Sequence, residues 1–362
     1  MDIGYSFWGS LADVKMKDHK LVSTPDGNAT YSSVIINQLQ SEGHTVYRLQ
    51  ENRDAEIVAK RGANAFLSFC QEERYEAYKC LINCPYSFPK LDLILFEWRM
   101  PVPGRNTMDD MELVTFEPDL LRQIQLLSHY AGKAKIVVFD LDYKLEMRDE
   151  VLFDDVIELG YKRGIEHHVD IPVFPMALYE YADMSSITHV PKTKSVTYIG
   201  NRYERDDSID MYLVPLASLG YDVNLYGNWI ERGRDSKTRW PQLRFHPRAQ
   251  LCDFRSILYE TSVVPLLLKD EYYEHGFMTA RIIETLVFGS VPALPSKFLN
   301  AHEWLPKELI FTTVEELALI IEKSHDVRWK ALVMSRARDM VFNRCDPALF
   351  TKRLLSCLFS EQ

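Results

Sequence analysis

No apolar run in this chain is long enough to cross a membrane, since none reaches 18 residues. The N-terminus, Met-Asp-Ile-Gly-Tyr, lacks the basic and apolar regions of a secretory signal. The six cysteines do not have the spacing of a zinc site, because Cys80 and Cys84 have no matching second pair. We therefore expect a cytoplasmic protein with reduced thiols, no membrane partner and no metal.

An excess of positive charge is absent as well. The 52 acidic residues outnumber the 42 basic ones, and the net charge of −10 opposes broad, non-specific attraction to nucleic acid or anionic membranes. A local basic patch stays compatible with that balance. With 46% hydrophobic and 26% charged residues the composition is that of a globular protein, and 362 residues are enough for two domains with separate cores.

The C-terminal half alternates strand patterns with helix patterns. Apolar or β-branched runs begin at Ser195, Val223, Leu243 and Val263, with loops and helical patterns between them. Units of about 30 residues in this order predict a parallel sheet with right-handed connections. Ligands of such sheets bind at the carboxyl ends of the strands. The residues that follow the strands, and that we expect to line one crevice, are Asn201, Arg202, Gly227, Asn228 and His246.

The segment 276–289 has the clearest binding pattern. We predict a helix start at Gly276, where unpaired N–H groups and the helix dipole favour a phosphate. Thr279 adds a hydroxyl, and Arg281 adds a forked cation suited to a diphosphate. Glu284 shares a helix face with Arg281 and is placed to accept hydrogen bonds from ribose hydroxyls. The segment predicts a nucleoside diphosphate site; an ordinary amphipathic helix is the alternative.

This segment resembles the donor-binding helix of glycosyltransferases with the GT-B fold. The resemblance is carried by T-x-R-x-x-E-x-L-x-x-G at 279–289, a short strand at 291–294, and the upstream sequences Tyr-Ile-Gly-Asn and Leu-Tyr-Gly in the same order. It covers residues 195–300 best. One departure is Gly276, because the commoner motif has there a second glutamate that grips the sugar.

The resemblance implies an α/β protein with two Rossmann-like domains facing across a cleft. We expect an N-terminal acceptor domain over 1–165, a linker region over 166–194, a nucleotide-sugar domain over 195–342, and a helix over 343–362 that crosses back to the first domain. The implied enzyme is a hexosyl- or pentosyltransferase that needs no cofactor and takes a UDP-sugar as co-substrate. The implied donor-binding residues are Gly9, Asn201, Arg202, Gly227, His246, Gly276, Phe277, Met278, Thr279, Arg281 and Glu284.

The N-terminal half shows a similar alternation, with strand patterns at 3–9, 45–49, 91–98 and 135–142. Functional loops are expected after residues 8, 98 and 140. Asp26 is the first candidate for a general base if the reaction inverts the sugar, although Pro-Asp-Gly is also a plain turn signature. Glu97, near the end of a buried strand, is the second candidate. Residues expected to contact the acceptor are Arg99, Arg105 and Asn106.

The sequence Asp-Leu-Asp at 140–142 has three readings. Paired carboxylates after a strand are typical of the metal site of GT-A transferases and of the nucleophile motif of haloacid-dehalogenase-like phosphatases. The phosphatase motif continues with a small hydroxyl residue, whereas Tyr143 and Lys144 follow here. The third reading, which we adopt, is a strand end that shapes the cleft and binds no metal.

The segment 229–248 concentrates basic and aromatic residues. Six arginines and lysines lie between 232 and 248 with one aspartate, and Trp229 and Trp240 are interleaved with them. In an acidic protein this is the best candidate surface for DNA, with aromatic rings stacking on bases; a solvated loop is the alternative.

The chain also looks like phage and bacterial glycosyltransferases, some of which modify hydroxylated bases in DNA. That resemblance implies a hydroxylated DNA base as leading acceptor, in the host cytoplasm if the protein is phage-encoded. A saccharide or small-metabolite acceptor and a non-catalytic nucleotide-sugar binder are the alternatives.

Overall fold

The computed structural model describes residues 1–6, 14–17, 20–23, 27–49, 89–98, 123, 126–140, 143, 145, 147–161, 168–170, 187–202, 204–231, 234–249 and 251–359. The chain divides into two compact units. The first unit comprises Met1–Ala177 and Pro347–Gln362, and the second unit comprises Leu178–Asp346.

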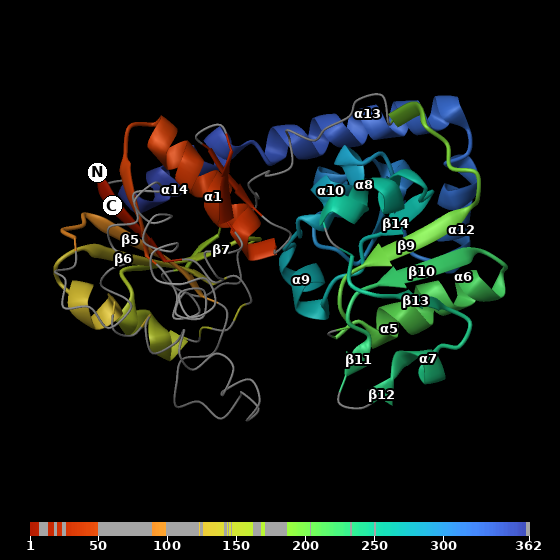
Figure 1. Cartoon of the computed structure of the whole chain (residues 1–362), viewed down its shortest axis with the longest axis horizontal. Coiled ribbons are helices and arrows are strands. Elements are labelled where there is room, and N and C mark those ends of the chain that lie inside the picture. Colours follow the sequence, from red (N-terminus) through yellow and green to blue (C-terminus); the bar gives the residue numbers. More distant parts are fainter. Residues whose placement is uncertain are drawn as a thin grey trace. The chain divides into compact units, whose positions relative to one another are not determined.

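The first unit contains a six-stranded parallel sheet in the order β4-β1-β5-β6-β7-β8 (Figure 1). Every residue of the central strand β5, Leu-Ile-Leu-Phe-Glu-Trp, is buried, as expected for a parallel strand covered on both faces. The strands are β1 (Asp2–Ser6), β4 (Thr45–Leu49), β5 (Leu93–Trp98), β6 (Lys135–Asp140), β7 (Asp155–Glu158) and β8 (His168–Asp170). A separate antiparallel hairpin is formed by β2 (Val14–Lys17) and β3 (Lys20–Ser23).

The helices of the first unit include one from the far end of the sequence. Helix α1 (Gly27–Ser41) contacts α14 (Pro347–Phe359), and a short 3-10 helix, η3, spans Met147–Leu152. The ring of Phe350 in α14 stacks on Phe139 of β6 at 6.5 Å between centroids. At the other end of the helix, Nζ of Lys135 donates to the carbonyl of Leu358 at 2.6 Å. The last helix is therefore part of the core of the first unit.

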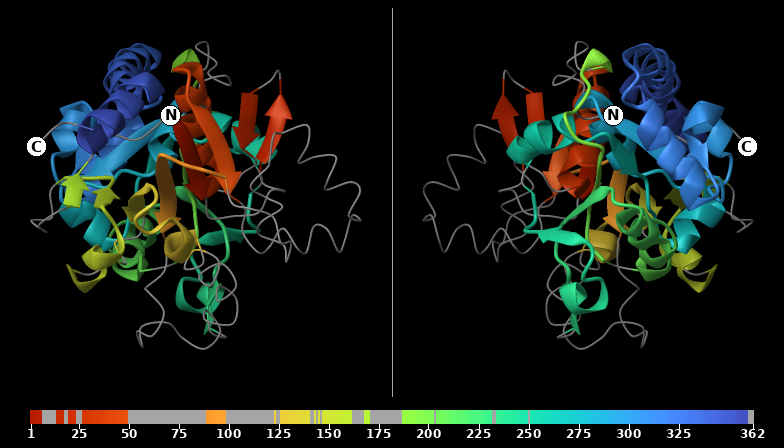
Figure 2. Two further views of the ribbon diagram at one scale, coloured as in Figure 1. Left: turned by 90° about the vertical axis from the view of Figure 1, so that its left-hand side faces the viewer. Right: turned by 90° about the vertical axis from the view of Figure 1, so that its right-hand side faces the viewer.

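The second unit contains another six-stranded parallel sheet, in the order β13-β10-β9-β14-β15-β16. Connections run in both directions from β9, so right-handed crossovers place helices on both faces (Figures 1 and 2). The strands are β9 (Ser195–Ile199), β10 (Asp222–Tyr226), β13 (Arg244–His246), β14 (Val263–Pro265), β15 (Val291–Pro295) and β16 (Ile310–Phe311), with a hairpin of β11 (Ile230–Glu231) and β12 (Arg234–Asp235).

Two helices of the second unit begin at side-chain caps. Thr313 and Glu316 form a capping box at the start of α12, and the Asp326 carboxylate caps α13. The helices are α5 (Asp206–Ser208), the π-helical η6 (Ile209–Leu213), α6 (Val214–Ser218), α7 (Ser236–Arg239), α8 (Leu251–Tyr259), α9 (Asp270–His275), α10 (Arg281–Val287), α11 (Ala301–Trp304), the 3-10 helix η7 (Lys307–Leu309), α12 (Val314–Lys323) and α13 (Val327–Arg344). The predicted α/β fold with two parallel sheets is confirmed.

Candidate functional site

The topology of the second unit locates a binding edge. From β9 the chain passes to β10 and β13 on one side, and it later returns to β14 and β15 on the other side. The connections after β9 and β14 therefore lead to opposite faces, and ligands of open parallel sheets bind beyond the carboxyl ends of the strands at such a point. The described residues of the two connections that leave this edge are 200–202, 204–205 and 266–280.

Gly276 ends a helix, so the prediction that it begins one is wrong. It is the C-cap of α9, with φ 64° and ψ 31°, and its N–H donates to the carbonyl of Tyr272. This left-handed conformation suits glycine because glycine has no Cβ. The next helix, α10, begins at Arg281, with Ala280 as its N-cap and no side-chain cap. Gly276 therefore does not provide the phosphate-binding helix N-terminus that the sequence predicted.

Arg281 and Glu284 lie on one face of α10, as their spacing predicts, and they form an ion pair there. Nη1 of Arg281 donates to Oε2 of Glu284, and the guanidinium carbon lies 5.2 Å from the centre of the Phe254 ring. The two side chains are 21% and 14% exposed, so both reach the surface from a largely buried position. Burial raises the pKa of Glu284, and the Arg281 guanidinium opposes that rise.

The ion pair keeps capacity to bind a polar ligand. Within the described part of the chain, Nε and Nη2 of Arg281 and Oε1 of Glu284 have no hydrogen-bond partner. The half-buried Thr279, which precedes α10, has no partner for its hydroxyl among those same residues. By contrast, Phe277 and Met278 are 4% and 2% exposed. Their buried side chains therefore hold the connection 266–280 to the core and are not available to a ligand. Together the polar groups offer donors for an anion and an acceptor for a hydroxyl.

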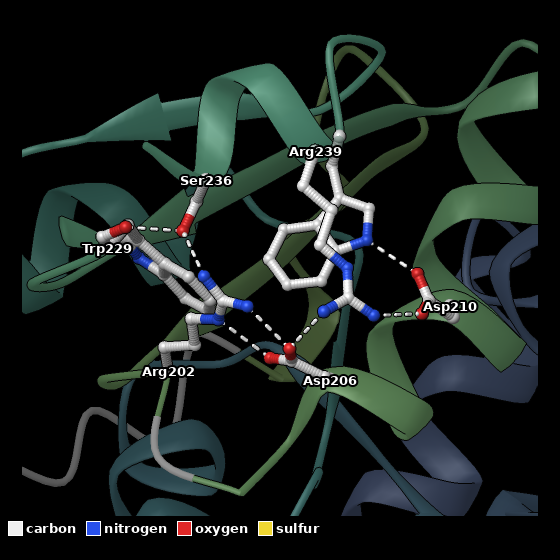
Figure 3. A network of polar contacts seen from close by, with 7 residues as sticks. Arg202, Asp206, Asp210, Trp229, Ser236 and Arg239 are labelled. Atoms are coloured by element: carbon white, nitrogen blue, oxygen red, sulfur yellow. Dashed lines mark hydrogen bonds and ion pairs between the residues drawn. The ribbon is translucent and has the colours of Figure 1, made fainter. Parts of the chain in front are cut away.

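Arg202, predicted to bind the diphosphate, is held inside the second unit (Figure 3). Its Nε and Nη2 donate to the two carboxylate oxygens of Asp206 at 2.7 and 2.5 Å. Its guanidinium carbon lies 4.9 Å from the centre of the Trp240 ring, and its side chain is 8% exposed. The bidentate contact with Asp206 assigns Arg202 to a structural cluster, which differs from the predicted role.

Arg205 extends from the connection after β9 to the connection after β14, and the sequence analysis gave it no binding role. Its Nε donates to the carbonyl of Leu267 at 3.2 Å, and its own N–H donates to the carbonyl of Arg202 at 3.1 Å. Because Leu267 follows β14, this half-buried cation spans the two diverging connections. Its signal in the sequence was its place shortly after the Gly-Asn end of β9, which Arg202 shares.

The ends of β9 and β10 approach each other closely. Asn201 accepts a hydrogen bond from the N–H of Asn228 at 2.9 Å. A Cβ on Gly227 would lie 2.1 Å from the carbonyl oxygen of Gly200, and Gly227 has φ 153°. On the adjacent strand, His246 stacks on Tyr226 at 4.3 Å and its Nε2 lies 2.8 Å from Oδ1 of Asn224. Asn201, Gly227 and His246 thus meet at the predicted edge, engaged with one another.

We expect Gly227→Ala to destabilise the protein by about 2–4 kcal/mol, since its new Cβ would overlap a backbone oxygen that no side-chain rotation can move. Urea unfolding followed by far-UV circular dichroism measures the change. Gly220→Ala is the matched control, because Gly220 also has a positive φ, 91°, but nothing lies within 4 Å of its Cβ position. That control is expected to cost about 1 kcal/mol; equal costs for both variants would contradict the close approach.

The first unit has its own switch of direction, between β1 and β5. Glu97 lies at the end of β5, is 1% exposed and accepts a hydrogen bond from the Tyr5 hydroxyl at 2.8 Å. Ser6, which ends β1, is fully buried. Asp140 is also buried, and its Oδ2 accepts a hydrogen bond from the N–H of Leu145 at 2.8 Å, as befits a strand end. The predicted residues that lie outside the described residues are Gly9, Asp26, Arg99, Arg105, Asn106 and Asp142.

The described side chains of 229–248 do not offer the stacking surface that the sequence predicted. Trp229 and Trp240 are 5% and 1% exposed, so their rings pack inside the protein. Arg239 binds the carboxylates of Asp206 and Asp210, and Arg244 pairs with Asp222 at 2.8 Å. The aromatic residues alternate with the basic ones because they anchor this segment to the second unit.

The described residues contain neither a metal-binding cluster nor a membrane-spanning helix. No three or more His, Cys, Asp or Glu side chains gather there in an arrangement that could hold a metal ion. None of the described helices combines the length and the apolar composition that crossing a bilayer requires.

The two Rossmann-like units define the fold class as GT-B, as predicted. The chain is similar to the β-glucosyltransferase of phage T4 in complex with UDP and Mn²⁺, with a TM-score of 0.63 and 13% identity over 99% of this chain and 100% of that one. It is similar to a DNA-modifying β-glucosyltransferase solved with and without uridine diphosphoglucose, with a TM-score of 0.60 and 12% identity over 99% of each chain. It is also similar to the Anabaena protein HepE in complex with UDP-glucose, with a TM-score of 0.56 and 14% identity over 100% of each chain. No family model and no curated protein sequence matches the chain.

Proposed function

We propose that this protein is a glycosyltransferase that moves a sugar from a UDP-sugar to an acceptor hydroxyl. The observation that carries the proposal is the match of nearly the entire chain to nearly the entire length of enzymes named as glucosyltransferases, two of them described with a uridine diphosphate ligand. The Arg281–Glu284 pair, with polar atoms left for a ligand, supports the same conclusion from the residues of this chain.

We assign the donor's diphosphate to Arg281 and Arg205, and its ribose to Glu284. Arginine presents several N–H donors in a planar fork that matches phosphate oxygens, and a carboxylate accepts hydrogen bonds from two vicinal hydroxyls. Thr279 adds a hydroxyl beside the phosphates. Positive charge at the diphosphate stabilises the leaving group as the bond to the sugar breaks. These cations are our reason to propose transfer without a metal, which the Mn²⁺ in the similar phage T4 complex makes worth testing with a chelator.

Glu97 and Asp26 remain the proposed alternatives for the general base. The buried position of Glu97 and its hydrogen bond from Tyr5 support a fixed carboxylate at the switch of direction in the first sheet. Such a carboxylate is the proposed acceptor of the proton from the attacking hydroxyl if the anomeric carbon is inverted. Arg99, Arg105 and Asn106 keep their proposed role near the acceptor.

The acceptor we propose is a hydroxylated base in DNA, supported by the similar structure that is described as DNA-modifying. A saccharide or small metabolite is the second candidate, since the described residues identify no class of acceptor and the similar HepE structure is described only with UDP-glucose. A non-catalytic nucleotide-sugar binder is the third, because Gly276 stands where a sugar-gripping glutamate is common. For DNA, the exposed Lys237 and Arg248 are the described basic residues of 229–248 that we propose as backbone contacts.

We expect UDP to be released from UDP-glucose only when an acceptor is present, and expect DNA with hydroxymethylated cytosine to be that acceptor. A coupled UDP assay with and without chelator measures the release, and mass spectrometry of the digested DNA measures the added hexose. Unmodified DNA of the same sequence is the control. Release with oligosaccharides alone would select the second candidate, and binding of UDP-glucose without any turnover would select the third.

A further inference from the structure

Three segments of the second unit meet in one cluster of charged and polar side chains, the clasp, shown in Figure 3. Arg202 comes from the connection after β9, and Asp206 and Asp210 come from the helical turns that follow it. Ser236 and Arg239 come from α7, beyond the β11–β12 hairpin. The clasp therefore ties the connection after β9 to the segment after β10.

Asp206 is the centre of the clasp. Its Oδ1 accepts from Nε of Arg202 at 2.7 Å, and its Oδ2 accepts from Nη2 of Arg202 at 2.5 Å and from Nη1 of Arg239. Both guanidinium groups lie within 5 Å of the Trp240 ring. Arg202 lowers the pKa of Asp206 through its hydrogen bonds, so the carboxylate is charged throughout the neutral range. Without this carboxylate, a largely buried arginine would lose its counter-charge.

Arg202 links the clasp to Arg205 through its backbone. The side chain of Arg202 binds Asp206, while its carbonyl accepts the N–H of Arg205 at 3.1 Å. Glu204, which precedes Arg205, has φ 52°, a left-handed conformation that is uncommon for residues other than glycine. Arg205 reaches the carbonyl of Leu267 at the end of β14. Arg202, which accepts the hydrogen bond from the N–H of Arg205, is thus itself held by Asp206.

We infer that Asp206 is a positioning residue for the diphosphate of the nucleotide-sugar, acting on Arg205 through Arg202, which binds both residues. The inference rests on the proposed function, since Arg205 is assigned there to the diphosphate. It predicts that loss of the carboxylate affects ligand binding more than the later chemical step. A purely structural clasp would instead change stability alone.

The test compares Asp206→Asn with Asp210→Asn. Asp210 belongs to the same clasp and binds Arg239 and Trp240, but it does not touch Arg202 in the described contacts. Calorimetry with UDP-glucose is expected to show at least tenfold weaker binding for Asp206→Asn and less than a threefold change for Asp210→Asn. In the turnover assay KM is expected to rise by a similar factor, with kcat changed less than threefold.

A double-mutant cycle with Arg205→Ala tests the route. If Asp206 acts through Arg205, Asp206→Asn weakens binding at most twofold further once Arg205 is gone. Unchanged UDP-glucose binding by Asp206→Asn, or its full effect in the Arg205→Ala background, would overturn the inference while leaving the proposed function intact. A wild-type protein that binds no UDP-sugar would remove both. If Asp206→Asn does not fold, Asp206→Glu keeps the charge and is expected to bind several-fold more weakly; wild-type affinity there would refute the positioning role.

Discussion

Replacing Glu284 by glutamine is expected to weaken UDP-glucose binding by roughly 10- to 100-fold, the effect of losing charge-assisted hydrogen bonds of about 1.5–3 kcal/mol. The amide keeps the size of the side chain but offers one acceptor oxygen, and it no longer balances the charge of Arg281. Isothermal titration calorimetry measures the change. Glu322→Gln is the matched control, because Glu322 is also ion-paired but contacts Lys194 at the opposite, amino-terminal end of β9. Equal affinities for wild type and Glu284→Gln would contradict the ribose assignment.

The same variant has an expected signature in pH. Burial raises the pKa of Glu284, so this carboxyl takes up its proton at a higher pH than an exposed glutamate does. Since the charged form is the better hydrogen-bond acceptor, UDP-glucose affinity should fall as the pH is lowered into that range. Glu284→Gln should lack this part of the pH dependence, and a dependence that it retains in full would belong to another group.

Replacing Arg338 by alanine is expected to destabilise the protein by about 3 kcal/mol or more, as is typical when a hydrogen-bonded buried cation is removed and a cavity remains. Arg338 is 1% exposed, and its Nε and Nη2 donate to the carbonyl of Leu286 at 3.1 and 2.7 Å. That carbonyl lies in α10, so the contact also holds the helix that carries Arg281 and Glu284. Chemical unfolding measures the loss.

Arg336 supplies the control for this stability prediction from the same helix. It is 46% exposed and pairs with Glu308 at 2.8 Å. Exposed pairs contribute little, so Arg336→Ala is expected to cost less than about 1 kcal/mol. If the two variants lost similar stability, the contact between Arg338 and Leu286 would not be what anchors α10.

The parallel sheets could be predicted because their strands are apolar on both faces. The runs that became β5, β6, β9 and β14 stand out in the sequence, since burial on both sides leaves few polar positions. Helix ends were harder to predict. Gly276 is compatible with a helix start and with a helix end, and only the path of the chain between α9 and α10 distinguishes the two.

Some candidate site residues could likewise be predicted from local sequence, and others could not. Arg281 and Glu284 were predicted on one helix face because their contact depends on a spacing of three residues, which the sequence contains. Arg202 and Arg205 are alike in the sequence. Asp206, four residues after Arg202, is a local partner, but Trp240 and Leu267 come from two distant segments that the fold brings in. The buried positions of Trp229 and Trp240 had no local signal either.

The order of strands and helices, and the shared helix face of Arg281 and Glu284, were determined by the sequence alone, because they depend on periodicity and short spacing. Which arginine is enclosed and which spans β9 and β14 was decided only by tertiary structure, as was the anchoring of α10 by Arg338. The physical reason is that burial and ion pairing between distant segments depend on which surfaces the fold brings into contact, and no local pattern of residues encodes that choice.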